Sequence, residues 1–333
     1  MLRILHNTKF DFIRRWRLAA ALVAVFILPA LVLVPVTGFN YSIEFTGGTL
    51  MQVEFQDAPA IADVRSALAD AGMTGVELST FGSPNELVMR AQDEEHVAAQ
   101  EGGAETVETR ITSVLTERFG ADAFKIVRSE AVGPKVGSEL RRQAAVALLI
   151  AFALTLVYLA WRFEWRFGFA AVLATVHDIV ATLAFMKYMN IEISLFVVGA
   201  ILTVVGYSMN DTVVVFDRVR ENLRSDRRSS LRDLLNRSVN ETLPRTVMTG
   251  TTTLASLLAL LIFGGSVIRP FAWVLSFGII IGTFSSIYVA SPLLLLIEHK
   301  WPRRAGEATA KGKPRVPRED PARARSKEPA AAR

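Results

Sequence analysis

Six long apolar segments, separated by charged ones, dominate the pattern of the chain. A helix needs about 20 apolar residues to cross a bilayer. Segments of about that length or longer lie at roughly 18–37, 143–161, 168–187, 193–216, 247–264 and 271–297. The last is long enough to tilt, or to begin outside the hydrocarbon. The pattern predicts a polytopic α-helical membrane protein with six transmembrane helices, five of them within 141–299.

Shorter periodicities mark residues 38–140, between the first two spans, as a separate domain. Alternation predicts a strand at Leu50–Phe55, and helical spacing predicts a helix at Ala58–Ala71. Strands at 76–80 and 85–90, a helix at 106–119 and a strand at 124–128 are predicted to follow. The order βαββαβ is the ferredoxin-like pattern, so we expect one small α+β domain outside the membrane.

Lysine and arginine collect on one side of the predicted topology. The N-terminus (1–17), the connection 162–166, the loop 217–245 and the tail (300–333) are all basic. Cytoplasmic segments carry such an excess, so both termini of this multi-pass membrane protein should be cytoplasmic. Residues 38–140, with 17 acidic and 7 basic residues, should be periplasmic. The tail should be disordered, with its basic residues near anionic membrane lipids.

The first apolar segment has a second interpretation, because it follows a basic N-terminus as a signal peptide does. Its apolar part spans about 20 residues, longer than the 7–15 of a signal peptide, and no convincing cleavage site follows. We therefore expect 18–37 to be an uncleaved transmembrane helix.

The composition of the chain argues against several kinds of chemistry. Hydrophobic residues make up 51% of it, too many for one ordinary soluble domain. There is no cysteine, and the four histidines lack the spacing of zinc ligands. Neither a nucleophile set nor a phosphate-binding glycine loop is present. We expect no catalysis, no cofactor, no metal and no nucleic-acid partner.

A carboxylate interrupts the fourth apolar segment. Ionisable groups at the depth of Asp211 are costly and usually line a polar cavity or a proton path. Tyr207 and Ser208 share its helical face, and Gly206 and Asn210 lie beside it. The alternative is that Asp211 only holds two helices together. Asn210 would do that without a titratable group, so we favour a proton role for Asp211.

Arg245 is a candidate partner for Asp211. It precedes the fifth apolar segment and enters the membrane from the side on which Asp217 follows Asp211. The hydroxyls of Thr249, Thr252 and Thr253 continue its face and would hold water. The alternative is that Arg245 is an ordinary cytoplasmic charge at the end of a span.

A second acid lies in the third apolar segment, where His177 and Asp178 are adjacent. Proton relays through membranes use such groups, so Asp178 joins the candidate pathway, with His177 as a supporting polar residue. A buried histidine that is simply hydrogen-bonded is the alternative. In the sixth segment Gly278, Gly282 and Ser286 recur at intervals of four, a pattern typical of close helix packing, to which Gly206 would also contribute.

Several motifs together resemble one family. They lie at 10–12, 45–48, 132–137, 206–222, 242–246 and 285–291. They are similar to those of the SecF family, the accessory membrane subunit of the bacterial Sec preprotein translocase, over about residues 9–299. One departure is visible: Ser42-Ile-Glu44-Phe stands where the family usually has Gly-Ile-Asp-Phe, so no role is carried onto Glu44.

The resemblance implies a function. SecF and a second subunit, SecD, each resemble half of a resistance-nodulation-division transporter. The pair sits beside the SecYEG channel and draws translocating preproteins into the periplasm with the proton gradient. The resemblance places Asp211 and Arg245 on the proton pathway. SecD would be a separate chain, and the periplasmic domain would contact SecD or the emerging preprotein.

Three other functions remain open at this point. A small-molecule exporter half usually has a much larger outer domain than the roughly 100 residues here. A passive scaffold that stabilises the translocon leaves the buried acids unexplained. An intramembrane enzyme would need a nucleophile or metal set beside them.

Overall fold

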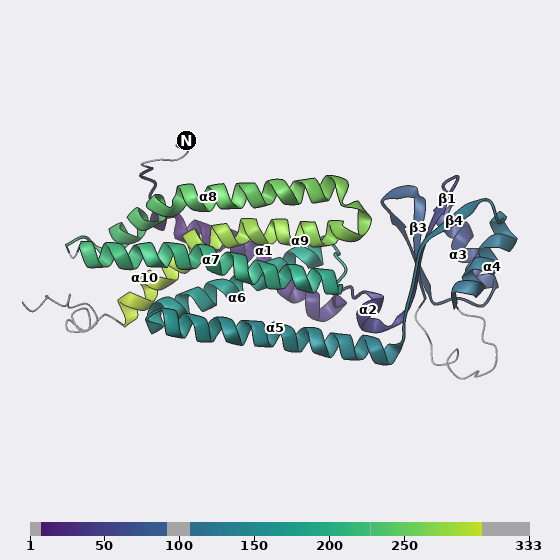
Figure 1. The fold of residues 1–333 in the computed structure, drawn as a ribbon, viewed down its shortest axis with the longest axis horizontal. Helices are drawn as coiled ribbons and strands as arrows, with labels where there is room; N and C mark the ends of the chain where they lie inside the picture. The colour runs from purple at the N-terminus through teal and green to yellow at the C-terminus, as the bar shows by residue number, and fades with distance from the viewer. Residues whose placement is uncertain (1–7, 92–106, 227, 302–333) are drawn as a thin grey trace, which may run out of the picture.

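The computed structural model describes residues 8–91, 107–226 and 228–301, as a helical bundle with an α+β domain at one end (Figure 1). The tail predicted to be disordered lies outside these residues beyond Trp301. The first described residues and the last helix lie at the end of the bundle away from the α+β domain.

Six helical stretches in the described part of the chain are long and apolar enough to cross a membrane, which confirms that prediction. They are α1 (Trp16–Thr37), α5 (Pro134–Arg162), α6 (Trp165–Tyr188), α7 (Leu195–Ser225), α8 (Leu231–Phe263), and α9 (Gly265–Ser285) with its continuation. A π-helical turn, Ser286–Ala290, joins α9 to α10 (Ser291–Lys300) within the sixth stretch.

The basic segment 217–245 is largely helical, which corrects the prediction of a loop. Helix α7 continues to Ser225, and α8 begins at Leu231, where the Ser230 hydroxyl accepts a hydrogen bond from the Asp233 N–H. Pro244 lies inside α8. Proline there removes one backbone hydrogen bond. The early turns of α8 still form because Leu234 and Leu235 are buried in the core.

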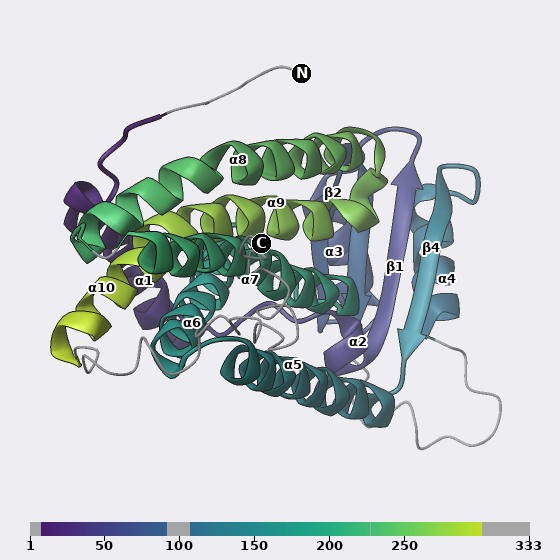
Figure 2. The same ribbon diagram turned by 60° about the vertical axis from the view of Figure 1, so that its left-hand side comes forward.

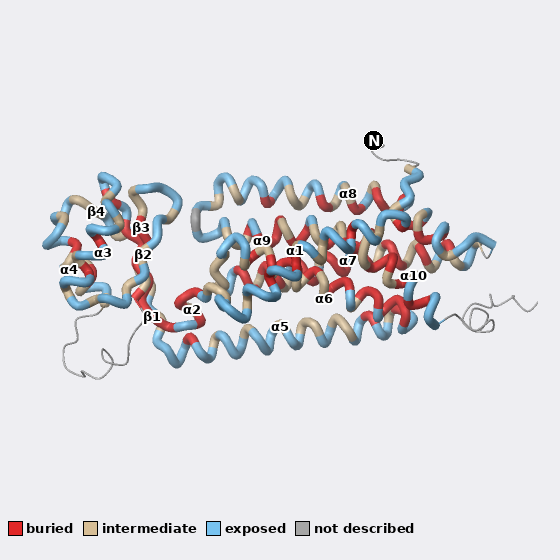
Figure 3. The backbone as a smooth tube through the Cα atoms, turned by 180° about the vertical axis from the view of Figure 1, so that it is seen from behind, coloured by how far each residue is buried: buried red, intermediate tan, exposed pale blue. Residues whose placement is uncertain are grey.

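Helices α6, α7 and α9 form the packed centre of the bundle, while α5 and α8 are mostly exposed (Figure 3). The contact of α7 with α9 depends on two glycines. A Cβ at Gly278 would overlap the Val204 side chain, and one at Gly282 would lie 2.9 Å from the Ser208 Cβ. Gly206, by contrast, has nothing within 4 Å of a Cβ position, so it packs against no helix in the described part of the chain.

Replacing Gly282 and Gly206 separately by alanine tests this packing. Gly282→Ala should lower the free energy of unfolding by about 1–3 kcal/mol, because the added methyl meets the α7 backbone. Gly206→Ala is the matched control and should be neutral, or stabilising by up to about 1 kcal/mol, since alanine favours a helix. Denaturant unfolding of the purified chain in detergent measures both. Equal effects would contradict the packing.

The α+β domain has the element order predicted from the sequence. Its elements are β1 (Gly48–Phe55), α3 (Ile61–Asp70), β2 (Val76–Phe81), β3 (Ser83–Ala91), α4 (Val107–Phe119) and β4 (Phe124–Val132). The sheet order is β2-β3-β1-β4 with antiparallel neighbours, which is compatible with a ferredoxin-like domain. Helices α3 and α4 cover one face over a core that includes Met51, Val53 and Met89.

The other face of the sheet is turned toward the membrane helices, with the short helix α2 (Ile43–Thr46) between them (Figure 2). The motifs at 45–48 and 132–137 meet here through their glycines. Gly47 has a φ of 79°, and a Cβ on it would lie 2.8 Å from Pro134 Cα at the start of α5. A Cβ on Gly137 would lie 2.8 Å from the Gly47 nitrogen. Only glycine permits this approach, which fixes the domain to α5.

Candidate functional site

Asp211 lies between α7 and α9, and its residue is only 2% exposed. The Thr283 hydroxyl of α9 donates a hydrogen bond to its carboxyl group over 3.3 Å. The sequence pointed to Asp211 but missed Thr283, whose only visible signal was a hydroxyl within the small-residue stripe of the sixth span. Because a hydroxyl can donate to a carboxylate and accept from a carboxylic acid, Thr283 can hydrogen-bond Asp211 in either protonation state.

Arg245 does not touch Asp211. The two side chains form no ion pair within 4.0 Å, and Arg245 is exposed, although its charge still acts on Asp211. Thr249, Thr252 and Thr253 each donate to the main-chain carbonyl four residues earlier. Their hydroxyls therefore satisfy carbonyl groups of α8 itself. Arg245 and Thr252 are exposed, whereas Thr249 and Thr253 are half-buried.

Tyr207 lies beside this site. A Cβ on Gly250 of α8 would be 3.6 Å from the Tyr207 hydroxyl and 3.7 Å from the Thr283 hydroxyl, so the two hydroxyls converge there. The Tyr207 hydroxyl is buried near Thr253 of α8, and no described residue satisfies it within 3.5 Å. Asn210, which the sequence placed beside Asp211, is exposed. Helix α8 thus approaches the hydroxyls of Tyr207 and Thr283 at Gly250, which has no side chain.

Asp178 belongs to a second polar cluster, between α6 and α7. It is fully buried, and the Ser208 hydroxyl donates to one of its carboxyl oxygens. The His177 Nδ1 lies 2.8 Å from the other oxygen, while its Nε2 is buried without a partner in the described part of the chain. Thr182 donates to the Asp178 carbonyl. Ser208 and Asp211 share a face of α7 but belong to different polar clusters. Ser208 bonds to Asp178 of α6, whereas Asp211 bonds to Thr283 of α9.

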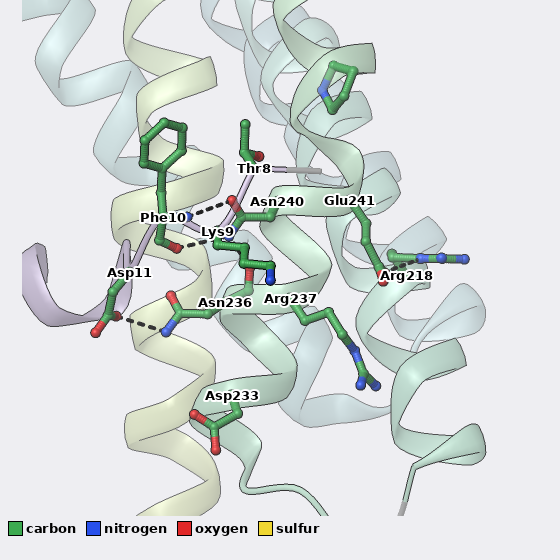
Figure 4. A pocket seen from close by; sticks show the side chains of 11 residues that line it. Thr8, Lys9, Phe10, Asp11, Arg218, Asp233, Asn236, Arg237, Asn240 and Glu241 are labelled. Atoms are coloured by element: carbon green, nitrogen blue, oxygen red, sulfur yellow. Dashed lines mark hydrogen bonds and ion pairs between the residues drawn. The ribbon is translucent and has the colours of Figure 1, made fainter. Parts of the chain in front are cut away.

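A third polar region, at the end of the bundle away from the α+β domain, holds the Phe10-Asp11-Phe12 motif. A cavity of about 850 Å³ opens there between the N-terminal segment, α7 and α8 (Figure 4). The Asn240 side chain accepts from the Phe10 N–H and donates to the Phe10 carbonyl, both over 2.9 Å. Asn236 donates to Asp11 over 2.8 Å and accepts from the Ile13 N–H. The sequence did not show that α8 binds this segment.

The N-terminal segment also reaches the π-helical turn that follows Thr283. The rings of Phe12 and Tyr288 are 5.9 Å apart in an edge-to-face arrangement. Ser286, one of the predicted packing residues, is fully buried at the start of this turn. Single π-helical turns within helices occur frequently at functional sites. The turn therefore connects the region around Asp211 to the end of the bundle that holds the N-terminal segment.

Asn240→Ala tests how the N-terminal segment is held. It removes both hydrogen bonds to the Phe10 peptide, each of which contributes about 1 kcal/mol. Hydrogen exchange at the Phe10 amide should become faster, with the rest of α8 unchanged. Arg237→Ala is the control, because Arg237 lines the same cavity but pairs with Asp226 instead. Equal exchange in wild type and Asn240→Ala would show that the segment is held otherwise.

The fold and the sites define a class: a polytopic membrane protein with carboxyl groups in its helical core and a small α+β domain. In the described residues no cluster of three or more metal-ligating side chains occurs. The family model for the C-terminal part of the protein export membrane proteins SecD/SecF matches residues 111–300, and the SecD/SecF GG motif matches 32–59.

Curated relatives show the same family over the full length. Protein translocase subunit SecF of Gemmatimonas aurantiaca is 57% identical, covering 95% of this chain and 99% of the relative. The same subunit of Desulfurispirillum indicum is 44% identical, covering 85% and 90%. This chain belongs to the SecF family of protein translocase subunits.

Solved structures agree with this assignment. The crystal structure of SecDF from Thermus thermophilus, a translocon-associated membrane protein, superposes with a TM-score of 0.79 at 35% identity. SecDF in a super-membrane-facing form gives 0.64 at 36% identity. The matches cover 90% and 88% of this chain but only 40% and 39% of those chains.

Proposed function

We propose that this chain is a proton-coupled accessory subunit of the Sec export machinery. With SecD as a separate chain, it would use the proton motive force to promote preprotein translocation through SecYEG across the inner membrane. The observation that carries the proposal is Asp211: a carboxyl group buried in a membrane helix, bonded to a hydroxyl and within electrostatic range of Arg245. The coupling ion is H⁺.

The energetics favour a proton at this position. Moving one charge across 100 mV is worth about 2.3 kcal/mol, which is enough to shift a two-state packing of helices substantially. Asp211 bonds to α9, while Arg245 stands apart on α8. Loss of the proton would create a charge that attracts Arg245, and its return would release Arg245. A proton cycle would therefore move α8 relative to α7 and α9.

The exposed face of α8 supports the need for a partner. Arg245, Thr252 and Ser256 are all exposed on it. Ser256 lies 11 residues after Arg245, so this polar stripe is about 17 Å long at 1.5 Å per residue. Polar groups in membrane helices usually face a bundle interior or a water-filled cavity. A second subunit that covers α8, as the remaining part of SecDF would, removes the stripe from lipid.

The charge distribution supports an orientation with both termini in the cytoplasm. The basic residues Arg14, Arg15 and Arg17 precede or begin α1, and the arginines of the α7–α8 region lie at the same end of the bundle. The α+β domain would then lie in the periplasm. There it would contact SecD or the preprotein as it leaves the channel.

Asp211→Asn tests the proposal. Cells depleted of the native subunit would receive this variant, and export of a pulse-labelled precursor would be followed with and without an ionophore. Export should fall to the depleted level and lose its ionophore sensitivity, because the amide cannot carry the proton. Co-purification with SecD must first show that the variant assembles.

Glu221→Gln is the matched control for this experiment. It makes the same acid-to-amide change on α7, at an exposed position outside the apolar core, and should leave export unchanged. Normal export by Asp211→Asn would remove the proton role. Asp211 would then only join α7 to α9, and the chain would act as a passive scaffold of the translocon.

A further inference from the structure

The α+β domain makes a second attachment to the membrane helices, away from its glycine contact with α5. Arg90 on β3 forms an ion pair with Glu192, which lies in the connection between α6 and α7. Both side chains are largely buried, at 20% and 24% exposure. The pair therefore joins the membrane-facing side of the sheet to the point where α7 begins.

Helix α2 adds a contact at the same point. Glu44 accepts a hydrogen bond from the Leu195 N–H over 2.6 Å, at the first residue of α7. A carboxylate there satisfies a free N–H and interacts favourably with the helix dipole. The backbones also pair: the Ser42 N–H donates to the Ile193 carbonyl, and the Ile193 N–H donates to the Asn40 carbonyl. Residues 40–44 and 192–195 thus form one joint.

The polar part of this joint is incompletely bonded. Glu192 Oε1 and Arg90 Nε are buried without hydrogen-bond partners in the described structure. A cavity of about 80 Å³, lined partly by apolar side chains such as Phe81 and Phe196, adjoins them. Two buried polar atoms of this ion pair have no hydrogen bond while the pair is formed. Water can bond to them when the pair opens, so opening this pair costs less free energy than opening one in which every polar atom is already bonded.

We propose that Arg90, Glu192 and Glu44 form a clamp through which the α+β domain holds the domain-side end of α7. The idea rests on the proposed function, because α7 also carries Asp211. Leu195 and Asp211 are 16 residues apart on one continuous helix, or about 24 Å at 1.5 Å per residue. A shift of α7 at Asp211 is therefore transmitted to the clamp, which makes Arg90, Glu192 and Glu44 positioning residues for domain movement.

The charges around Glu192 make the clamp sensitive to pH. Burial raises the pKa of Glu192 and the charge of Glu44 raises it further, while Arg90 and Arg128 oppose them. Glu130 of β4 also lines the cavity. A pKa raised in the clamped state means that this state binds the proton more tightly than the open one. The clamp is therefore most stable when Glu192 is a neutral acid that accepts the Arg90 hydrogen bond through its carbonyl oxygen, and desolvation weakens the ion-paired form. Proton binding therefore stabilises the clamped state relative to the open state. This stabilisation is fully present below the ordinary pKa of glutamate and is lost as pH rises through the raised pKa of Glu192.

Spin labels on the full chain in nanodiscs test the clamp. The chain has no cysteine, so Glu117→Cys on α4 and Leu258→Cys on α8 would carry the only two labels. Pulsed electron paramagnetic resonance then reports the distance between the domain and the bundle. The parent should show one narrow distance population at low pH and a second, displaced population as pH rises.

Two substitutions at Glu192 separate the possible outcomes. Glu192→Ala leaves Arg90 unpaired and should show the displaced population at every pH. Glu192→Gln keeps a hydrogen-bond acceptor without a charge and should keep the narrow population at every pH. Arg65→Ala, on the exposed side of α3, is the control and should behave as the parent. Unchanged thermal unfolding shows that each variant is folded.

Two results would overturn the clamp: Glu192→Ala that keeps only the narrow, undisplaced population, or a pH response that persists in Glu192→Gln. These distances are measured without export, so they do not depend on the outcome for Asp211→Asn. If the spin-label distances behave as expected but Asp211→Asn exports normally, the clamp is supported. Only its connection to proton coupling is then removed.

Discussion

The structure depends on one constraint: each carboxyl group inside the apolar bundle must be bonded from a neighbouring helix. Helix α7 takes part in the hydrogen bonds of both buried acids, Asp178 and Asp211. Its Ser208 donates to Asp178 of α6, and its Asp211 accepts from Thr283 of α9. The close approach that brings Thr283 within reach exists because Gly278 and Gly282 have no side chains. Polar bonding and glycine packing therefore specify the same arrangement of three helices.

The same helix connects three regions of the molecule. Its first turn is held by the joint with the α+β domain, its middle carries Asp211, and its last turns extend beyond the apolar core beside α8. The contrast between the packed centre and the exposed α5 and α8 is consistent with this role. A change in charge at the middle of α7 can move both of its ends only if the helix stays continuous, and it does from Leu195 to Ser225.

Much of this could be predicted from the sequence, because span length and depth of burial follow from local hydrophobicity. The six spans, the α+β domain and Asp211 are of this kind. Thr283 could not be predicted, since its contact depends on how α7 and α9 pack. The start of α8 was misplaced because the apolar run begins only near residue 247, whereas burial of Leu234 and Leu235 stabilises the helix from Leu231. Gly206 packs against no described residue, since local sequence does not show which face of α7 meets another helix of the bundle.

The most direct test of the central claim is the protonation of Asp211 itself. Infrared difference spectra of the chain with SecD in proteoliposomes, recorded across an imposed pH change, report carboxyl groups that gain or lose a proton. The account predicts a carboxylic acid carbonyl band that changes with pH in the parent and in Glu221→Gln and is absent in Asp211→Asn. The same band in Asp211→Asn would contradict the account, because another group would then carry the proton.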